Sequence, residues 1–156
     1  MNSPAEKTAK KLLEKGATVA VAESCTGGLL ASALTDLPGA SKFFRGGAVT
    51  YATETKTEIL GVPAELIARF GVVSANCAEA MARGAAEKFH TDFALSTTGI
   101  AGPDGGTPGT PVGTVFIGIF TPDGTSSLRF RATGTTRDAV RREAVVTALN
   151  ALAERI

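Results

Sequence analysis

Apolar residues follow two different patterns along the chain, and their alternation predicts a layered α/β fold. Short runs that are apolar nearly throughout, at 17–22 and 92–97, are typical of strands covered on both faces. Stretches with apolar residues on one side lie between them and predict helices. We expect helices over 4–15, 27–37, 54–60, 63–70 and 75–89 and from 135 or 136 to about 155, and strands over 17–22, 43–52, 92–97, 112–120 and 126–132.

The order of these elements predicts a three-layer α/β/α sandwich. Helices between strands imply crossover connections and a sheet covered on both faces. A turn signal at 122–124 predicts that the last two strands form an antiparallel hairpin, which makes the sheet mixed although mostly parallel. The 156 residues show no repeat or linker, so we expect a single domain over 1–156.

Composition narrows the classes of partner. The net charge of +1 provides no basic stripe, which argues against a nucleic-acid partner. No apolar run is long enough to span a bilayer, and residues 1–15 are charged and helical in pattern, unlike a signal peptide. We therefore expect a cytoplasmic protein with no membrane partner. Cys25 and Cys77 lack metal-ligand spacing and are expected to be free thiols, although the sequence leaves a disulfide between them open.

The apolar run at 19–22 ends abruptly at a polar turn of small residues, Glu23 to Gly28, and a helical pattern follows at once. A strand that leads directly into a helix presents backbone N–H groups at the helix N-terminus, where an anion or an oxyanion can bind. The turn contains two candidate nucleophiles, Ser24 and Cys25. Ser24 or Thr26 could equally be a helix cap, and Cys25 a packing residue, so residue types alone leave these alternatives open.

A second candidate segment is the loop 98–111, which is rich in Gly and Pro and follows the strand at 92–97. If this strand and the strand at 17–22 are parallel neighbours, their loops share one edge of the sheet, where open α/β sheets bind ligands. Neither loop matches a P-loop or a dinucleotide fingerprint. Their backbone N–H groups fit a small anionic or nucleotide ligand.

The position of the single histidine argues against a Ser-His or Cys-His catalytic pair. His90 ends a long helix just before a strand, which places it at the opposite edge of the sheet. A serine nucleophile then needs another base, and a lysine can serve if burial lowers its pKa. Lys56 and Lys42 are the candidates nearest the loop edge. Thr98 could relay a proton or orient the lysine, and the N–H groups of residues 25–27 could form an oxyanion hole.

Several motifs resemble the CinA C-terminal domain family, the nicotinamide-nucleotide amidohydrolases. They are residues 22–28 (AESCTGG), 47–51 (GAVTY), Lys56 followed by 60–62 (LGV), 71–74 (GVVS), 98–106 (TGIAGPDGG) and 111–115 (PVGTV). The resemblance covers nearly the whole chain. Because no amino-terminal molybdopterin-binding-like domain is seen, the chain resembles the stand-alone deamidase form.

The resemblance implies hydrolysis of the carboxamide of nicotinamide mononucleotide to nicotinate mononucleotide and ammonia. It assigns the nucleophile to Ser24, the base to Lys56 and an assisting hydroxyl to Thr98. It also implies a mixed-sheet α/β/α fold, a homodimer, and no metal or cofactor. The substrate contacts that we expect for such a small-molecule nucleotide are Cys25, Thr26, Gly27, Tyr51, Gly99 and Arg141.

The main alternative is a non-catalytic nucleotide-binding or competence/damage-associated regulatory module. In that interpretation the Gly-rich loops hold a ligand and Ser24 is only a helix cap. Membership of the family does not by itself decide between the two functions.

Overall fold

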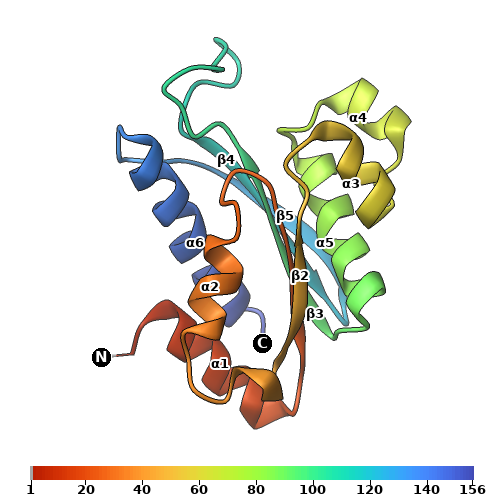
Figure 1. Cartoon of the computed structure of the whole chain (residues 1–156), viewed down its shortest axis with the longest axis vertical. Helices are drawn as coiled ribbons and strands as arrows, with labels where there is room; N and C mark the ends of the chain where they lie inside the picture. Colours follow the sequence, from red (N-terminus) through yellow and green to blue (C-terminus); the bar gives the residue numbers. More distant parts are fainter. Residues whose placement is uncertain (1) are drawn as a thin grey trace.

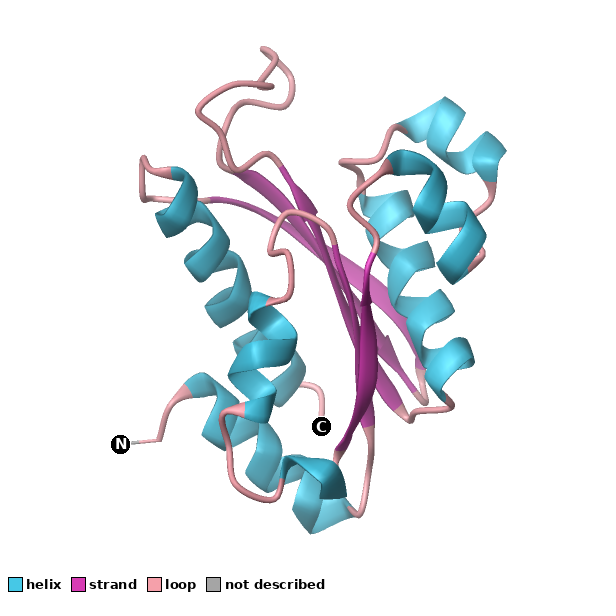
Figure 2. Ribbon diagram, in the orientation of Figure 1, coloured by secondary structure: helices cyan, strands magenta, loops and turns pink. Residues whose placement is uncertain are grey.

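A five-stranded mixed sheet forms the middle layer of the computed structural model, which describes residues 2–156 (Figures 1 and 2). The strand order is β2-β1-β3-β4-β5, with β1 parallel to β2 and β3, and β4 antiparallel to β3 and β5. Because β4 alone runs against its neighbours, the sheet is mixed with most strands in one direction, as predicted. The strands are β1 (Val19–Glu23), β2 (Phe44–Val49), β3 (Phe93–Gly99), β4 (Thr114–Thr121) and β5 (Gly124–Arg131).

Helices cover both faces of the sheet, which confirms the three-layer sandwich (Figure 1). One face carries α1 (Pro4–Lys15), α2 (Leu29–Thr35) and α6 (Arg137–Ala153). The other face carries α3 (Thr53–Leu60), α4 (Ala64–Phe70) and α5 (Ala75–Phe89), and a short 3-10 helix, Ala40–Lys42, precedes β2. Within residues 2–156, no helix has both the length and the apolar character needed to cross a lipid bilayer.

The core lies in two layers because side chains of a strand alternate between faces. In the fully buried strand β1, Val19 and Val21 pack on the side of α1, α2 and α6, whereas Ala20 and Ala22 pack on the side of α5. Small residues on the second face let α5 approach closely. Gly118 of β4, for example, lies against the Ala78 carbonyl of α5, with no room for a Cβ atom.

Local signals account for most element ends. Ser3 and Glu6 form the predicted capping box of α1, and Gly16 ends that helix in the left-handed conformation at φ 62°. The helix predicted from residue 27 begins only at Leu29, because Gly27 and Gly28 have φ of 55° and 107° and belong to the turn.

The strand predicted over 43–52 is shorter than expected. β2 ends at Val49, and the chain then leaves the sheet before α3, whose N-cap is Ala52 without a side-chain cap. Thr53, which is well placed in the sequence to cap this helix, is instead its first residue. The backbone carbonyls of Thr50 and Tyr51 are therefore free of the ladder and face Lys56.

The expected shared edge is present. β1 and β3 are parallel neighbours, with Glu23 opposite Thr97, so the turn after β1 and the loop after β3 lie side by side. His90 is the C-cap of α5 and precedes β3, at the opposite edge, as predicted. Lys42 immediately precedes β2 and is also at that opposite edge, so its nomination as a base near the loops is wrong.

Candidate active site

A cavity of ≈ 410 Å³ opens where the turn after β1 meets the loop after β3. Its walls come from five segments: the turn, the stretch from Tyr51 to Lys56, residues 72–73 before α5, the loop 98–105, and Arg137 at the start of α6. Six of the predicted residues line it, and three do not. The lining residues are Ser24, Cys25, Tyr51, Lys56, Thr98 and Gly99, and those outside it are Thr26, Gly27 and Arg141.

Lys56 and Ser24 form the chemical centre of this cavity. Lys56 Nζ donates a hydrogen bond to Ser24 Oγ at 3.1 Å and also bonds to the carbonyls of Thr50 at 2.5 Å and Tyr51 at 3.5 Å. The whole lysine residue is only 1% exposed. One hydroxyl and two carbonyls thus hold the amine in a single position beside the serine.

The electrostatic setting favours a neutral amine. Burial lowers the pKa of Lys56 below its usual 10.5, against smaller opposing effects from Cys77 and Cys25. Among residues 2–156, no carboxylate forms an ion pair with Lys56. A lowered pKa increases the fraction of the amine that is neutral, and a neutral amine is the form that can accept a proton from a serine.

Burial shifts the pKa of the neighbouring Cys25 in the opposite direction. Its side chain is buried, and burial, reinforced by the Glu23 carboxylate, raises the pKa of its thiol to about 11. A thiol with that pKa stays protonated at neutral pH and is a poor nucleophile. Cys25 and Cys77 are both free and buried, so no disulfide joins them. Among the described residues, Lys56 Nζ is hydrogen-bonded to Ser24 Oγ and not to the Cys25 thiol, and this contact favours Ser24 over Cys25.

Glu23 holds the turn in its conformation. Its carboxylate, on a residue only 1% exposed, accepts hydrogen bonds from the Thr26 hydroxyl at 2.6 Å and from the N–H groups of Gly28, Leu30 and Ala31 at 3.1, 2.9 and 3.0 Å. These N–H groups belong to the start of α2, where Gly28 offers no side-chain cap. The helix N-terminus that the sequence suggested for an anionic ligand is therefore filled by the protein's own carboxylate.

Sequence reasoning missed this role of Glu23. The available signal was a carboxylate at the end of a fully buried strand, directly before a helix without its own cap. A buried carboxylate needs several donors, and the nearest unpaired donors are those of the following helix.

The three expected oxyanion donors differ in this structure. The Gly27 N–H donates to the Ser24 carbonyl at 3.1 Å and is already used. Within the described part of the chain, the N–H groups of Cys25 and Thr26 have no acceptor. The Thr26 side chain is occupied by Glu23 and by the Thr97 hydroxyl at 2.7 Å. Of these two residues only Cys25 lines the cavity, so its N–H is the candidate donor of the turn.

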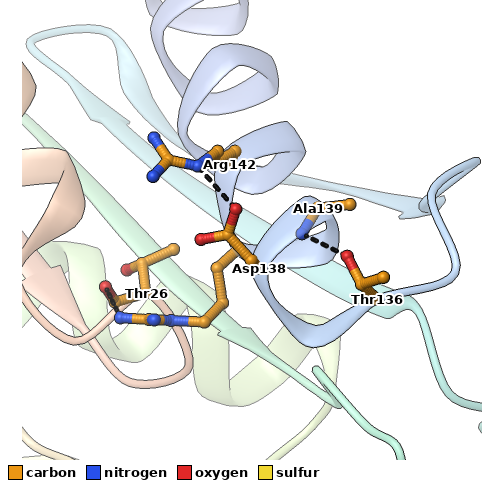
Figure 3. Close-up of polar contacts among 6 residues, drawn as sticks. Thr26, Thr136, Asp138, Ala139 and Arg142 are labelled. Atoms are coloured by element: carbon orange, nitrogen blue, oxygen red, sulfur yellow. Dashed lines mark hydrogen bonds and ion pairs between the residues drawn. The ribbon is translucent and has the colours of Figure 1, made fainter.

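Arg141 supports the turn from α6 and does not line the cavity. Its Nε donates to the Cys25 carbonyl at 3.0 Å and its Nη2 to the Thr26 carbonyl at 3.1 Å. Figure 3 shows Thr26 beside the first turns of α6. A Cβ at Gly27, which has φ of 55°, would lie 3.2 Å from the Arg141 guanidinium. Arg141, expected as a substrate contact, is therefore a residue that positions the turn.

Thr98 lines the cavity but bonds elsewhere. Its hydroxyl donates to the Val72 carbonyl at 2.7 Å, which joins the end of β3 to the segment before α5. In this structure it makes no hydrogen bond to Lys56 or Ser24 among the described residues. Thr98 therefore lines the cavity and holds the segment before α5 against the end of β3.

Arg137 and Tyr51 stand at the mouth of the cavity. Tyr51 is 59% exposed, and its Oη accepts a hydrogen bond from Arg137 Nη2 at 2.8 Å. Arg137 Nη1 donates to the Gly102 carbonyl of the loop, also at 2.8 Å. Arg137 is the first residue of α6, after the cap Thr136, which accepts a hydrogen bond from the Ala139 N–H (Figure 3). Sequence reasoning missed Arg137, because an exposed arginine beside a helix cap carries no distinctive signal.

No metal site accompanies these groups. In residues 2–156, no group of three or more His, Cys, Asp and Glu side chains is placed to hold a metal ion. Asp104 is the one carboxylate among the residues that line the cavity.

Comparison with known proteins identifies the family. The family model described as CinA C-terminal domain matches residues 1–156. A CinA-like protein of Geobacter sulfurreducens is 51% identical over 148 residues, and one of Dictyoglomus thermophilum is 47% identical over 141 residues. These matches cover 95% and 90% of this chain but 36% and 34% of the relatives. The chain thus spans about a third of the length of the curated relatives it matches.

Solved structures agree over almost their full length. A CinA superfamily protein from Klebsiella pneumoniae 700603 superposes with a TM-score of 0.93 at 37% identity, covering 97% of this chain and 94% of that chain. One from Escherichia coli gives a TM-score of 0.93 at 33% identity, covering 99% and 91%. With a matching family model, close relatives and the same fold, the chain belongs to the CinA C-terminal domain family.

Proposed function

We propose that this domain is an amidohydrolase in which Ser24 is the nucleophile and Lys56 the general base. The single observation that carries the proposal is the 3.1 Å hydrogen bond between Lys56 Nζ and Ser24 Oγ. It joins a buried amine of lowered pKa to a hydroxyl that lines a cavity of ≈ 410 Å³. A positioned amine of this kind does the work that histidine does in other serine hydrolases.

The reaction follows from this geometry. When Lys56 is neutral, its two N–H bonds serve the carbonyls of Thr50 and Tyr51, and its lone pair faces Ser24 Oγ. Lys56 then takes the Ser24 proton as Oγ attacks the carboxamide carbon, and the carbonyl oxygen becomes an oxyanion. The N–H group of Cys25, a residue that lines the cavity, is the donor available to stabilise it. The Lys56 ammonium then returns its proton to the leaving nitrogen, and ammonia departs. Water, deprotonated by Lys56, hydrolyses the acyl-enzyme to a carboxylate and restores Ser24.

We propose nicotinamide mononucleotide as the substrate, with nicotinate mononucleotide and ammonia as products. This choice rests on the family resemblance of the motifs around Ser24, Lys56 and Thr98. The cavity volume lies within the range of about 300–1,000 Å³ that is usual for small-molecule sites, which supports a ligand of mononucleotide size.

The test is ammonia release from nicotinamide mononucleotide by wild type, Ser24→Ala and the neighbouring variant Cys25→Ala. We expect Ser24→Ala to lower kcat by more than the roughly 10²–10³-fold typical of losing one oxyanion donor. Cys25→Ala should keep kcat within about tenfold of wild type, since its thiol is protonated and packed. Full activity in Ser24→Ala would refute the assignment, and loss confined to Cys25→Ala would move the nucleophile to the thiol.

The regulatory alternative gives a different result in the same experiment. A non-catalytic module would be stabilised against thermal unfolding by nicotinamide mononucleotide, because any ligand of the folded state raises Tm. It would release no ammonia.

A further inference from the structure

We propose that Arg137 and Tyr51 are the residues that bind the phosphate of the proposed nucleotide substrate, at the mouth of the cavity. This inference rests on the proposed function, since it places the far end of the same substrate. A phosphate bound in this cavity needs hydrogen-bond donors or a cation there.

Within the described residues, the N-terminus of α2 has no free donors for this phosphate. Three of its N–H groups, together with the Thr26 hydroxyl, already bond to the Glu23 carboxylate. A second anion at this position would face a buried carboxylate of the same charge. The Lys56 amine is also unsuitable, because its burial favours the neutral form and its hydrogen bonds go to Ser24 and two carbonyls.

Arg137 is the remaining cation among the residues that line the cavity. Its two recorded partners, the Tyr51 hydroxyl and the Gly102 carbonyl, are neutral. No carboxylate of residues 2–156 forms an ion pair with it, and this includes Asp104 on the same cavity wall. Its positive charge is therefore held in place without being neutralised.

Two other arginines of α6 show the contrast. Arg142 points to solvent and pairs with Asp138 at 2.8 Å (Figure 3). Arg141 is committed to the carbonyls of the turn. Arg137 alone of the three reaches the cavity, and its two hydrogen bonds leave three of five guanidinium N–H groups free. Arginine presents such donors in a planar fork that suits phosphate oxygens.

Tyr51 completes the donor set. Its hydroxyl oxygen accepts from Arg137, so its own O–H proton is free to donate. Tyr51 comes from the segment that leads into α3, whereas Arg137 begins α6 on the other face of the sheet (Figure 1). The pair therefore bridges the mouth of the cavity, and a phosphate bound there leaves the rest of the substrate to extend inward toward Ser24 and Lys56.

The experiment compares two substrates that differ by the phosphate, nicotinamide mononucleotide and nicotinamide riboside. For Arg137→Ala we expect KM for the mononucleotide to rise roughly 10- to 100-fold, as for the loss of one charge-assisted contact, with kcat within about threefold. KM for the riboside should change by less than about threefold. Tyr51→Phe should show the same selectivity with a smaller rise, of roughly threefold to tenfold. Arg142→Ala, on the same helix, should match wild type with both substrates.

If Arg137 only holds the loop in place through Gly102, the selectivity for the phosphate should be absent. Arg137→Ala would then impair both substrates equally, and that result would overturn the proposal and assign the phosphate to backbone N–H groups of the loop 98–111. Because Arg137 is exposed, the variant is expected to fold, and its Tm confirms this.

A binding measurement separates failure of this inference from failure of the proposed function. If wild type releases no ammonia from either compound, the hydrolase assignment fails. Calorimetric titration of Ser24→Ala, with and without Arg137→Ala, then decides the phosphate site. Loss of affinity for the mononucleotide alone supports it, and unchanged affinity overturns it.

Discussion

Replacing Glu23 by glutamine tests whether one buried carboxylate holds the turn that contains Ser24 in its conformation. Glu23 Oε1 accepts from the Thr26 hydroxyl and from two N–H groups, and Oε2 accepts from the Ala31 N–H. A glutamine side chain has nearly the same shape but presents one NH2 group. In its better orientation that group faces the Ala31 N–H, so two donors confront each other in a buried position.

The expected loss of stability in Glu23→Gln follows from these contacts. An unsatisfied buried donor costs about 1–3 kcal/mol, and the three remaining hydrogen bonds lose the extra strength that a charged acceptor provides. We therefore expect Glu23→Gln to lower the free energy of unfolding by roughly 2–4 kcal/mol. A domain of this size has about 5–15 kcal/mol in total, so the variant should remain folded in dilute buffer.

The assay is equilibrium unfolding in urea, followed by far-UV circular dichroism. The matched control is Glu6→Gln, which also alters a carboxylate at a helix N-terminus but in the exposed capping box of α1. Glutamine serves in a capping box as well, so this change should cost less than about 0.5 kcal/mol. If Glu23→Gln costs no more than Glu6→Gln, the carboxylate does not organise the turn as argued.

Two further predictions concern the base and the packing behind it. Burial lowers the pKa of Lys56 from 10.5, so between that lowered value and 10.5 the unfolded chain binds a proton that the folded chain does not. The stability of wild type relative to Lys56→Met should therefore rise with pH across this window. Urea unfolding at about pH 6, 8 and 10 measures this difference in the free energy of unfolding. A difference independent of pH would contradict a lowered Lys56 pKa. Gly84→Ala should destabilise by roughly 1–3 kcal/mol in the same assay, because its Cβ would collide with the Leu60 carbonyl of α3, whereas Gly109→Ala meets open space and should change stability by less than about 0.5 kcal/mol. Stabilisation by Gly84→Ala, as helix propensity alone predicts, would show that α3 and α5 are less closely packed than described.

Local patterns along the chain were enough to predict the type and order of the elements, and hence which loops meet. Periodicity and burial pattern depend on neighbours along the chain, so the buried strand at 19–22, the capping box of Ser3 and Glu6 and the turn at Ser24 were recognisable locally. Parallel strands align their carboxyl ends, and this placed the turn and the loop 98–111 at one edge without any structure.

The tertiary structure decided which side chains reach the cavity. Residue type alone left Lys56 and Lys42 both open as candidate bases, although the family resemblance named Lys56. The position of β2 separates them physically by placing Lys42 at the far edge. Arg141 and Arg137 are one helical turn apart, yet one supports the turn of the nucleophile and the other lines the cavity mouth. Such differences depend on contacts between elements that are distant in the chain.

The charge and burial of the side chains around the cavity also depend on the tertiary structure. Nothing in the local sequence shows that the Lys56 amine is buried without a counterion, or that Glu23 fills the N-terminus of α2. Burial and charge pairing arise when separate elements pack together, and both determine pKa. Local pattern thus located the turn that contains Ser24, whereas the packing of α3 and α6 around it decided which side chains line the cavity.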